Sequence, residues 1–284
     1  MIRAGFALLA ALSLAACHAR TQWPTPAPAL WQVEGPRGER GWLFGTIHAL
    51  PEGARWETPA LERALGEAGT LVVEVANLAD ATAGARAFAA VSRSPGLPPL
   101  LQRVPAADRP ALARALANAG LDERAFATVE SWAAAVMIAN AGHAGEAANG
   151  VDRALLARRV PVVGLEGFAE QFAIFDRLPQ AEQDDLLRLT AEDDGAAQDR
   201  QETRAWIAGD LPALEREAHD GILADPQLRQ ALLVDRNARW VGRIAPLVLQ
   251  GKRPFVAVGA AHMLGSAGLP AQLASRGFKV TRIE

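Results

Sequence analysis

The sequence predicts an α/β (α+β) fold, with a mixed central sheet built from N- and C-terminal strands and a large helical insertion between them. Strand-like patterns lie near both ends of the chain, at residues 30–47 and 254–283. The long middle is rich in alanine and carries apolar residues at helical spacing. For the core to be continuous, the terminal strands must pair or neighbour each other, so the middle is an insertion and not a separable domain.

The size and charge of the chain restrict the possible classes of protein. Its 284 residues are 50% hydrophobic and 21% charged, which suffices for one large domain with its own core. The formal net charge is −3, and no run of lysine and arginine marks a basic patch. We therefore expect no nucleic-acid partner.

The N-terminus has the pattern of an export signal. A positive start at Arg3 precedes a small, apolar stretch over residues 4–16, which is too short for a permanent membrane span. The signal ends in Leu14-Ala15-Ala16-Cys17, the arrangement that lipoprotein signal peptidase cleaves ahead of an acylated cysteine. Residues 1–16 are therefore predicted to be a lipoprotein signal peptide. An ordinary signal peptide with an incidental cysteine is the alternative.

Cys17 is the only cysteine, so it has no partner for an internal disulfide, and lipidation explains it best. We expect attachment to the membrane through this lipid, in the bacterial cell envelope. Because His18 and not aspartate follows, the expected destination is the outer membrane, facing the periplasm. Residues 17–28 contain three prolines and are predicted to be an extended tether.

The domain is predicted to span residues 29–284 and to begin with a hairpin. Residues 30–34 alternate like a half-buried strand, residues 35–38 turn the chain, and residues 41–47 return as a second strand. Thr58-Pro59 then has the pattern of an N-cap followed by proline at the first helical position. Residues 71–75 are predicted to form the next strand.

Two helical insertions are expected, at roughly residues 79–148 and 169–250. The first is predicted to be a lobe of short helices, with Gly120 as a C-cap. The second ends in a long helix that begins at Asp225-Pro226. Between them we expect a helix over residues 150–159 and a short buried strand over residues 160–166.

Residues beyond the second insertion return to strand patterning. Residues 254–258 form an apolar run, residues 265–276 have the pattern of a loop and helix, and residues 278–283 are predicted to be the last strand.

Two segments share one local design, with an apolar strand followed by glycine, two residues and histidine. The first runs from Gly45 to His48 and the second from Gly259 to His262. Glycine permits close approach at a strand end, and the carboxyl ends of strands in α/β sheets line ligand crevices. Two imidazoles there could converge on a divalent metal, or one could donate a proton. The alternative is two structural histidines.

Several polar residues are candidates for the same site. Glu74 interrupts an apolar strand, where a buried carboxylate is costly unless it is paired or metal-bound. It is a candidate metal ligand or general base, or else an edge-strand residue facing solvent. Glu166 ends the later strand and could supply a second carboxylate, whereas Asp152 could simply begin a helix. Arg236 and Asn237 could orient a carboxylate or an oxyanion, although a solvated arginine is the commoner outcome.

Other chemistries lack their motifs. The sequence contains no Gly-x-Ser-x-Gly elbow, His-Glu-x-x-His pair, phosphate-binding Gly-Lys-Ser/Thr loop or cysteine cluster. Serine, thiol and P-loop mechanisms are therefore not expected. His143 and His219 lack the strand-end setting and are predicted to be surface residues.

Five pieces of sequence together resemble the TraB/PrgY/GumN family, relatives of the animal TIKI proteases. The pieces are residues 43–48, 72–75, 150–171, 235–237 and 255–280, so the resemblance covers essentially the whole mature chain. In TIKI-like members, the two Gly-x-x-His histidines and the strand glutamate are regarded as the active site of a divalent-metal-dependent peptidase. The resemblance thus implies that His48, His262 and Glu74 bind Mn, Co or Zn.

These inferences lead to two expected functions. The first is an envelope hydrolase that uses a divalent metal to cleave a peptide or a small-molecule substrate. The second is a non-catalytic protein that sequesters a small ligand or peptide in the same crevice.

Overall fold

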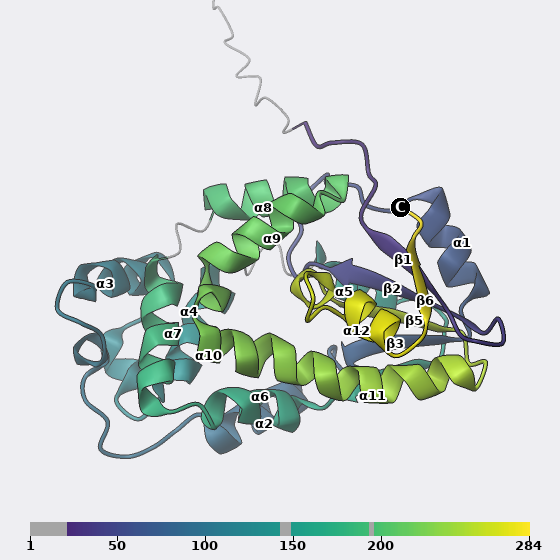
Figure 1. Ribbon diagram of the computed structural model, residues 1–284. Coiled ribbons are helices and arrows are strands. Elements are labelled where there is room, and N and C mark those ends of the chain that lie inside the picture. Colours follow the sequence, from purple (N-terminus) through teal and green to yellow (C-terminus); the bar gives the residue numbers. More distant parts are fainter. Residues whose placement is uncertain (1–21, 143–148, 193–195) are drawn as a thin grey trace, which may run out of the picture.

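The computed structural model describes residues 22–142, 149–192 and 196–284. Its six strands form one sheet in the order β4-β3-β5-β2-β1-β6, with helices on both faces (Figure 1). The strands are β1 (Leu30–Glu34), β2 (Arg40–Thr46), β3 (Thr70–Val75), β4 (Val162–Glu166), β5 (Pro254–Gly259) and β6 (Lys279–Arg282).

Most α-helices of the described chain lie between β3 and β5, in agreement with the predicted helical middle. They are α1 (Pro59–Glu67), α2 (Ala81–Val91), α3 (Arg109–Asn118), α4 (Ser131–Gly142), α5 (Val151–Leu156), α6 (Phe168–Asp176), α7 (Gln180–Glu192), α8 (Ala196–Ala208), α9 (Leu211–Asp220), α10 (Pro226–Arg229), α11 (Asp235–Leu249) and α12 (Leu269–Ser275).

The sheet is mixed and joins the two ends of the chain, which confirms the predicted fold class. β1 and β2 form the expected antiparallel hairpin, and β6 adds antiparallel to β1. β2 lies directly beside β5 in parallel, with Gly45 opposite Val258 and Thr46 opposite Gly259. β3 is parallel to both β5 and β4. The carboxyl ends of these four strands therefore meet at one edge of the sheet, which places both Gly-x-x-His motifs there.

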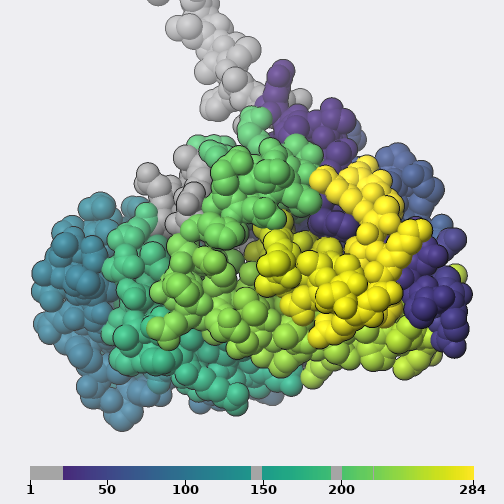
Figure 2. Space-filling view, in the orientation of Figure 1, coloured from purple at the N-terminus to yellow at the C-terminus, as the bar shows by residue number. Residues whose placement is uncertain are grey.

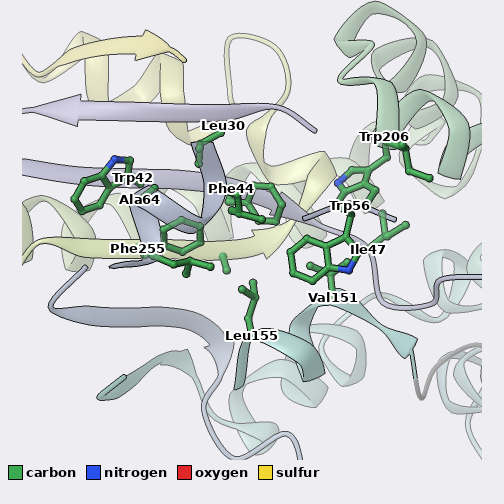
Figure 3. Packing of buried hydrophobic residues seen from close by; sticks show 14 of the residues in the cluster. Leu30, Trp42, Phe44, Ile47, Trp56, Ala64, Val151, Leu155, Trp206 and Phe255 are labelled. Carbon is green, nitrogen blue, oxygen red and sulfur yellow. The ribbon is translucent and has the colours of Figure 1, made fainter. Parts of the chain in front are cut away.

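Alternating residues of the strands bury two cores, one on each face of the sheet. On one face, Phe44 packs against Trp56 and Trp206, with ring centroids 6.0 and 6.1 Å apart (Figure 3). The helices α1, α5, α8 and α9 contribute to this core. On the other face, Leu43 and Val256 pack against α11 and α12. Close packing on both faces fixes the sheet edge on which the motifs lie.

A separate helical lobe has its own core. Its buried residues include Leu112, Trp132 and Leu187, with Leu228 of α10 completing it. Figure 2 shows the blue-teal part of this lobe at one end of the molecule, and the yellow C-terminal elements toward the other end, beside the purple N-terminal hairpin. Because α10 belongs to the lobe and α11 packs on the sheet, this helical segment links the two regions.

The prediction of a buried strand at residues 160–166 was wrong in one respect. β4 lies at the edge of the sheet, and Val163 is 40% exposed. The apolar run of β4 has the pattern of a central strand that is covered on both faces of the sheet. How much of such a strand is covered depends on its position in the strand order, and β4 is an edge strand. Only the end of β4, at Leu165 and Glu166, is buried.

The local helix signals are confirmed. Thr58 caps α1 by accepting a hydrogen bond from Leu61 N, and Gly120 follows α3 with φ of +66°. Asp225 caps the long helix as predicted. That helix contains a π-helical turn over Gln230–Val234, directly before α11. Since π turns insert an extra residue, this turn changes which side chains of the following helix face the sheet.

The predicted signal peptide and Cys17 lie outside the described residues. Residues 22–28 lie against the domain, where Trp23 packs on the first core and Ala27 N donates to Ile207 O. Among the described helices, none has the length and apolar character needed to cross a membrane.

Candidate functional site

The two histidines and the strand glutamate surround one point, the position that a Cβ on Gly259 would occupy. A Cβ built on Gly259 would lie 3.3 Å from Glu74 Oε1, 3.8 Å from His48 Nε2 and 3.7 Å from His262 Cδ2. Glu74 is in β3, His48 follows β2, and His262 lies in the short turn after β5. The parallel order β3-β5-β2 therefore brings together three residues that are up to 214 positions apart.

His48 is oriented by a buried aspartate. Its Nδ1 is 2.8 Å from Asp152 Oδ2, and Thr46 Oγ1 donates to Asp152 Oδ1 at 2.7 Å. The hydrogen bond with Asp152 raises the pKa of His48. Because the His48 side chain is 72% exposed, water screens part of this effect. Asp152 occupies the first turn of α5, but its carboxylate serves His48 and not the helix terminus.

His262 is oriented by Asn237 of α11. Its Nδ1 lies 2.6 Å from Asn237 Oδ1, while Asn237 Nδ2 donates to the carbonyls of His262 and Ala267. Since the amide nitrogen is used in this way, Oδ1 accepts from the Nδ1–H of His262, which leaves a lone pair on Nε2. Burial lowers the pKa of His262 to about 3, so the ring is neutral near pH 7.

Glu74 lies on an inner strand, and its side chain is only 12% exposed. This excludes the alternative of an edge-strand residue facing solvent. Oε1 accepts from Gly259 N at 2.9 Å and lies 4.0 Å from His262 Nε2. Oε2 accepts from Arg236 Nη2 at 2.6 Å and from Gln171 Nε2 at 3.3 Å. Burial raises the pKa of Glu74, but the positive charges of His262, which is protonated only in the acid range where Glu74 titrates, and of Arg236 and His48 outweigh burial and lower this pKa.

Arg236 is buried and connects the two candidate carboxylates. Besides Glu74, its guanidinium contacts Glu166, with Nη2 2.9 Å from Oε2. Trp240 Nε1 also donates to Glu166, and the Trp240 ring lies under the guanidinium at 4.5 Å. Glu166 therefore positions Arg236 and does not face the histidines. The commoner outcome of a solvated arginine does not hold here, since Arg236 is only 8% exposed.

The two motif glycines differ in what surrounds them. A Cβ on Gly45 would come within 2.9 Å of Ala260 Cα, so β2 and the turn after β5 approach too closely for a side chain. The carbonyl of Gly45 also accepts from Trp206 Nε1 at 2.7 Å. Gly259 instead borders the space between the histidines. Gly45 thus sets the spacing of the backbone, whereas Gly259 keeps the site open.

The donor set has the chemistry of a divalent-metal site. Both Nδ1 atoms are hydrogen-bonded to an acceptor, which leaves both Nε2 atoms as candidate ligand atoms, the arrangement that is usual for metal-binding histidines. The present spacing is wider than a bound ion requires. Arg236 Nη1 lies 3.3 Å from His262 Nε2, and the ligand atoms of His48, His262 and Glu74 do not all fall within 4.8 Å of one another. Binding would require Nη1 to release Nε2 and the imidazoles to approach Glu74.

A second group of residues could also hold a metal ion. Within the described ranges, the carboxylates of Glu182, Asp185 and Asp225 lie within 4.8 Å of one another. This acidic group belongs to α7 and the start of α10, on elements that carry none of the residues predicted for the site.

Sequence patterns missed three residues that contact the site. Thr46 lies inside the first motif and holds Asp152, and Gln171 donates to Glu74. Trp240 packs on the His262 ring with centroids 4.3 Å apart. The sequence could have indicated Trp240, because it lies four residues after Arg236 and therefore on the same face of the helix. Among the other histidines, His219 is exposed and its Nδ1 contacts Glu215 O, whereas His143 lies outside the described residues.

These features define a class of α/β protein with histidines and a carboxylate converging at the carboxyl ends of adjacent parallel strands. The chain belongs to the TraB/PrgY/gumN family, whose model matches residues 29–282. The match confirms the resemblance found in the motifs. No curated protein and no solved structure matches the chain significantly.

Proposed function

We propose that this protein is a divalent-metal-dependent hydrolase that cleaves peptide bonds at the His48–Glu74–His262 site. The observation that carries the proposal is the convergence of these three side chains around Gly259. Both imidazoles have their Nδ1 atoms engaged by Asp152 and Asn237. This arrangement fixes ring orientation before a metal or substrate arrives, which is a requirement of an efficient site.

In this proposal, His48 and His262 hold Mn, Co or Zn through Nε2, with Glu74 Oε1 as the third ligand. When bound, such an ion polarises a carbonyl and lowers the pKa of a coordinated water. The lowered pKa of Glu74 makes its carboxylate a weak base and favours the ligand role. Once released from His262, Nη1 of Arg236 faces the site and can donate to a developing oxyanion.

A non-catalytic binding protein is the second candidate. The observation that favours it is the contact of Arg236 with both Glu74 and His262, which satisfies these side chains without a metal. A guanidinium in this position could bind the carboxylate of a small ligand or peptide in a fixed orientation. Such a protein would hold its ligand stoichiometrically, with or without metal.

The proposal is tested by elemental analysis of the purified protein, followed by cleavage of a peptide library with added Mn, Co or Zn. We expect bound metal and cleavage that a transition-metal-selective chelator abolishes. His48→Ala and Glu74→Gln should lose cleavage while remaining folded, whereas His219→Ala is the matched control and should retain it. Stoichiometric peptide binding with no metal and no cleavage would favour the binding protein. Full activity in either site variant would exclude the proposed roles.

We further propose that the protein is lipid-anchored at Cys17 in the bacterial envelope, with the domain in the periplasm. Support comes from the signal-like residues 1–16 and from the single cysteine, Cys17, that follows them. Cells expressing the wild type should incorporate labelled fatty acid into the protein and retain it in the outer-membrane fraction. Cys17→Ser should lose both the label and the membrane association. A labelled Cys17→Ser protein would refute the anchor.

A further inference from the structure

Three carboxylates meet where α7 approaches the N-terminus of α10. Glu182 and Asp185 are three residues apart on α7 and share one face, and Asp225 is the N-cap residue of α10. Their carboxylate oxygens lie within 4.8 Å of one another. Like charges this close repel unless a proton or a cation lies between them.

The Glu182 carboxylate is the least satisfied of the three. The residue is only 7% exposed, and its Oε2 is buried without a hydrogen-bond partner among the described residues. Burial, the nearby charges of Asp225 and Asp185, and a hydrogen bond with Asp225 raise the pKa of Glu182, so the two carboxylates either share a proton or lack a cation. An unpaired buried acceptor costs about 1–3 kcal/mol in a folded protein, so a missing partner is the simplest explanation.

The hydrogen bonds that Asp185 and Asp225 accept from neighbouring residues use only one oxygen of each carboxylate. Asp225 uses Oδ1 to accept from the backbone N–H groups of Gln227 and Leu228, so capping does not occupy Oδ2. Asp185 accepts from Arg188 through Oδ1, and Arg188 also pairs with Glu192. The single positive charge of Arg188 is therefore divided between Asp185 and Glu192. It cannot neutralise all three carboxylates of the acidic group.

Glu182 also borders a cavity of about 870 Å³ between α6 and the α10–α11 segment. Of the three carboxylates, only Glu182 lines this cavity, so water or a hydrated ion in the cavity meets the acidic group at Glu182. Because α10 continues through the π turn into α11, the group is joined by one helical segment to Arg236.

We propose that Glu182, Asp185 and Asp225 form a structural Ca²⁺ site that joins α7 to α10. Ca²⁺ binds oxygen ligands at about 2.3–2.6 Å, so two ligands on opposite sides of the ion are up to about 5 Å apart. Ligand atoms within 4.8 Å of one another can surround such an ion. Three protein carboxylates favour Ca²⁺ over Mg²⁺, because Mg²⁺ usually keeps several waters and takes only one or two carboxylates. Waters from the cavity complete the coordination. The donor set contains oxygen alone, which distinguishes it from the histidine site.

The proposal is tested by calorimetric titration of Ca²⁺ into the chelator-treated full-length protein, together with thermal melting with and without Ca²⁺. We expect one Ca²⁺ site with a Kd of about 10⁻⁴–10⁻³ M, in the range of weak calcium modules, and a Tm that rises with Ca²⁺. Glu182→Gln should weaken binding at least tenfold, since the substitution keeps the side-chain shape and removes the charge. Glu67→Gln, an equal change at the exposed end of α1, should bind as the wild type does.

A second comparison separates cation binding from proton sharing. Without Ca²⁺, Glu182→Gln should be at least as stable as the wild type, because one repulsive charge is gone. With Ca²⁺, the wild type should become the more stable of the two. If Ca²⁺ neither binds nor changes the Tm of the wild type, or if Glu182→Gln keeps its full Ca²⁺ response, the proposed site is refuted. An equal response to Mg²⁺ would refute the choice of ion.

Discussion

Gly45 and Gly259 occupy the same place in two copies of one motif, yet the structure assigns them different roles. The difference depends on what a methyl group would meet: backbone at Gly45, and the facing polar groups of the site at Gly259. Sequence patterns identified both glycines but could not separate these roles, because the close neighbours of Gly45 and Gly259 come from other strands and turns.

Gly259→Ala is predicted to affect binding more than stability. The added methyl would lie 3.3 Å from Glu74 Oε1 and enter the space that the histidines share, while the backbone has φ of −46°, which alanine adopts. We expect at least a tenfold loss of metal affinity and of cleavage, with unfolding free energy changed by less than about 1 kcal/mol. Metal titration and urea denaturation measure the two effects. Unchanged metal affinity would contradict the proposed location of the ion.

Gly45→Ala is predicted to affect stability more than binding. Its methyl would meet Ala260 Cα at 2.9 Å, and backbone cannot yield as a flexible side chain does. We expect a loss of about 1–3 kcal/mol in the free energy of unfolding, the usual cost of overpacking. Urea denaturation measures it. A fully stable Gly45→Ala protein would show that β2 and the turn after β5 have room for a methyl group.

Arg236 is predicted to be essential for stability because it neutralises buried carboxylates. Arg236→Met keeps the apolar stem but removes the buried cation that pairs with Glu74 and Glu166, leaving Glu166 with only the exposed Arg239 at 3.5 Å, which costs about 3–5 kcal/mol near pH 7. The lowered pKa of Glu74 stabilises the wild type above pH 4.5, and this stabilisation is lost as pH falls through the folded value of about 2. The difference in unfolding free energy between the wild type and Arg236→Met should therefore become smaller as pH falls below 4.5. Denaturation curves across this range measure the difference, and a constant difference would contradict the ion-pair explanation.

At the scale of elements, local signals predicted what depends on local physics. The hairpin of β1 and β2, the N-cap at Thr58 and the start of the long helix at Asp225 all follow from neighbouring residues. The exposure of β4 depends on strand order, which no residue of β4 encodes. The π turn before α11 was also missed, because one extra residue barely changes apolar spacing over a long helix.

The cap at Thr58 gives a prediction for α1. Thr58 is buried, and its hydroxyl both caps α1 and hydrogen-bonds the carboxylate of Glu284, the last residue. Thr58→Ala should lower the free energy of unfolding by about 1 kcal/mol or more. Thr58→Ser keeps the hydroxyl and should lose less. Equal losses for the two substitutions in urea denaturation would show that the methyl group, and not the cap, stabilises the helix.

At the scale of the whole molecule, the site depends on contacts between the two ends of the chain. The expectation that the terminal strands are neighbours came from the need for a continuous core, and the parallel pairing of β2 with β5 bears it out. The partners of each candidate could not be predicted in the same way. Arg236 reaches Glu74, and Asn237 reaches His262, only because α11 packs across the sheet, which depends on the packing of distant side chains.

The most direct test of a shared site is a double-mutant cycle on Co²⁺ affinity with His48→Ala, His262→Ala and the double variant. If both imidazoles hold one ion, each single substitution should remove most of the binding, and the double variant should bind little less than either single one. One equivalent of Co²⁺ is expected for the wild type. Losses that simply add, or a single variant that still binds as the wild type does, would mean that His48 and His262 do not act on a common ligand.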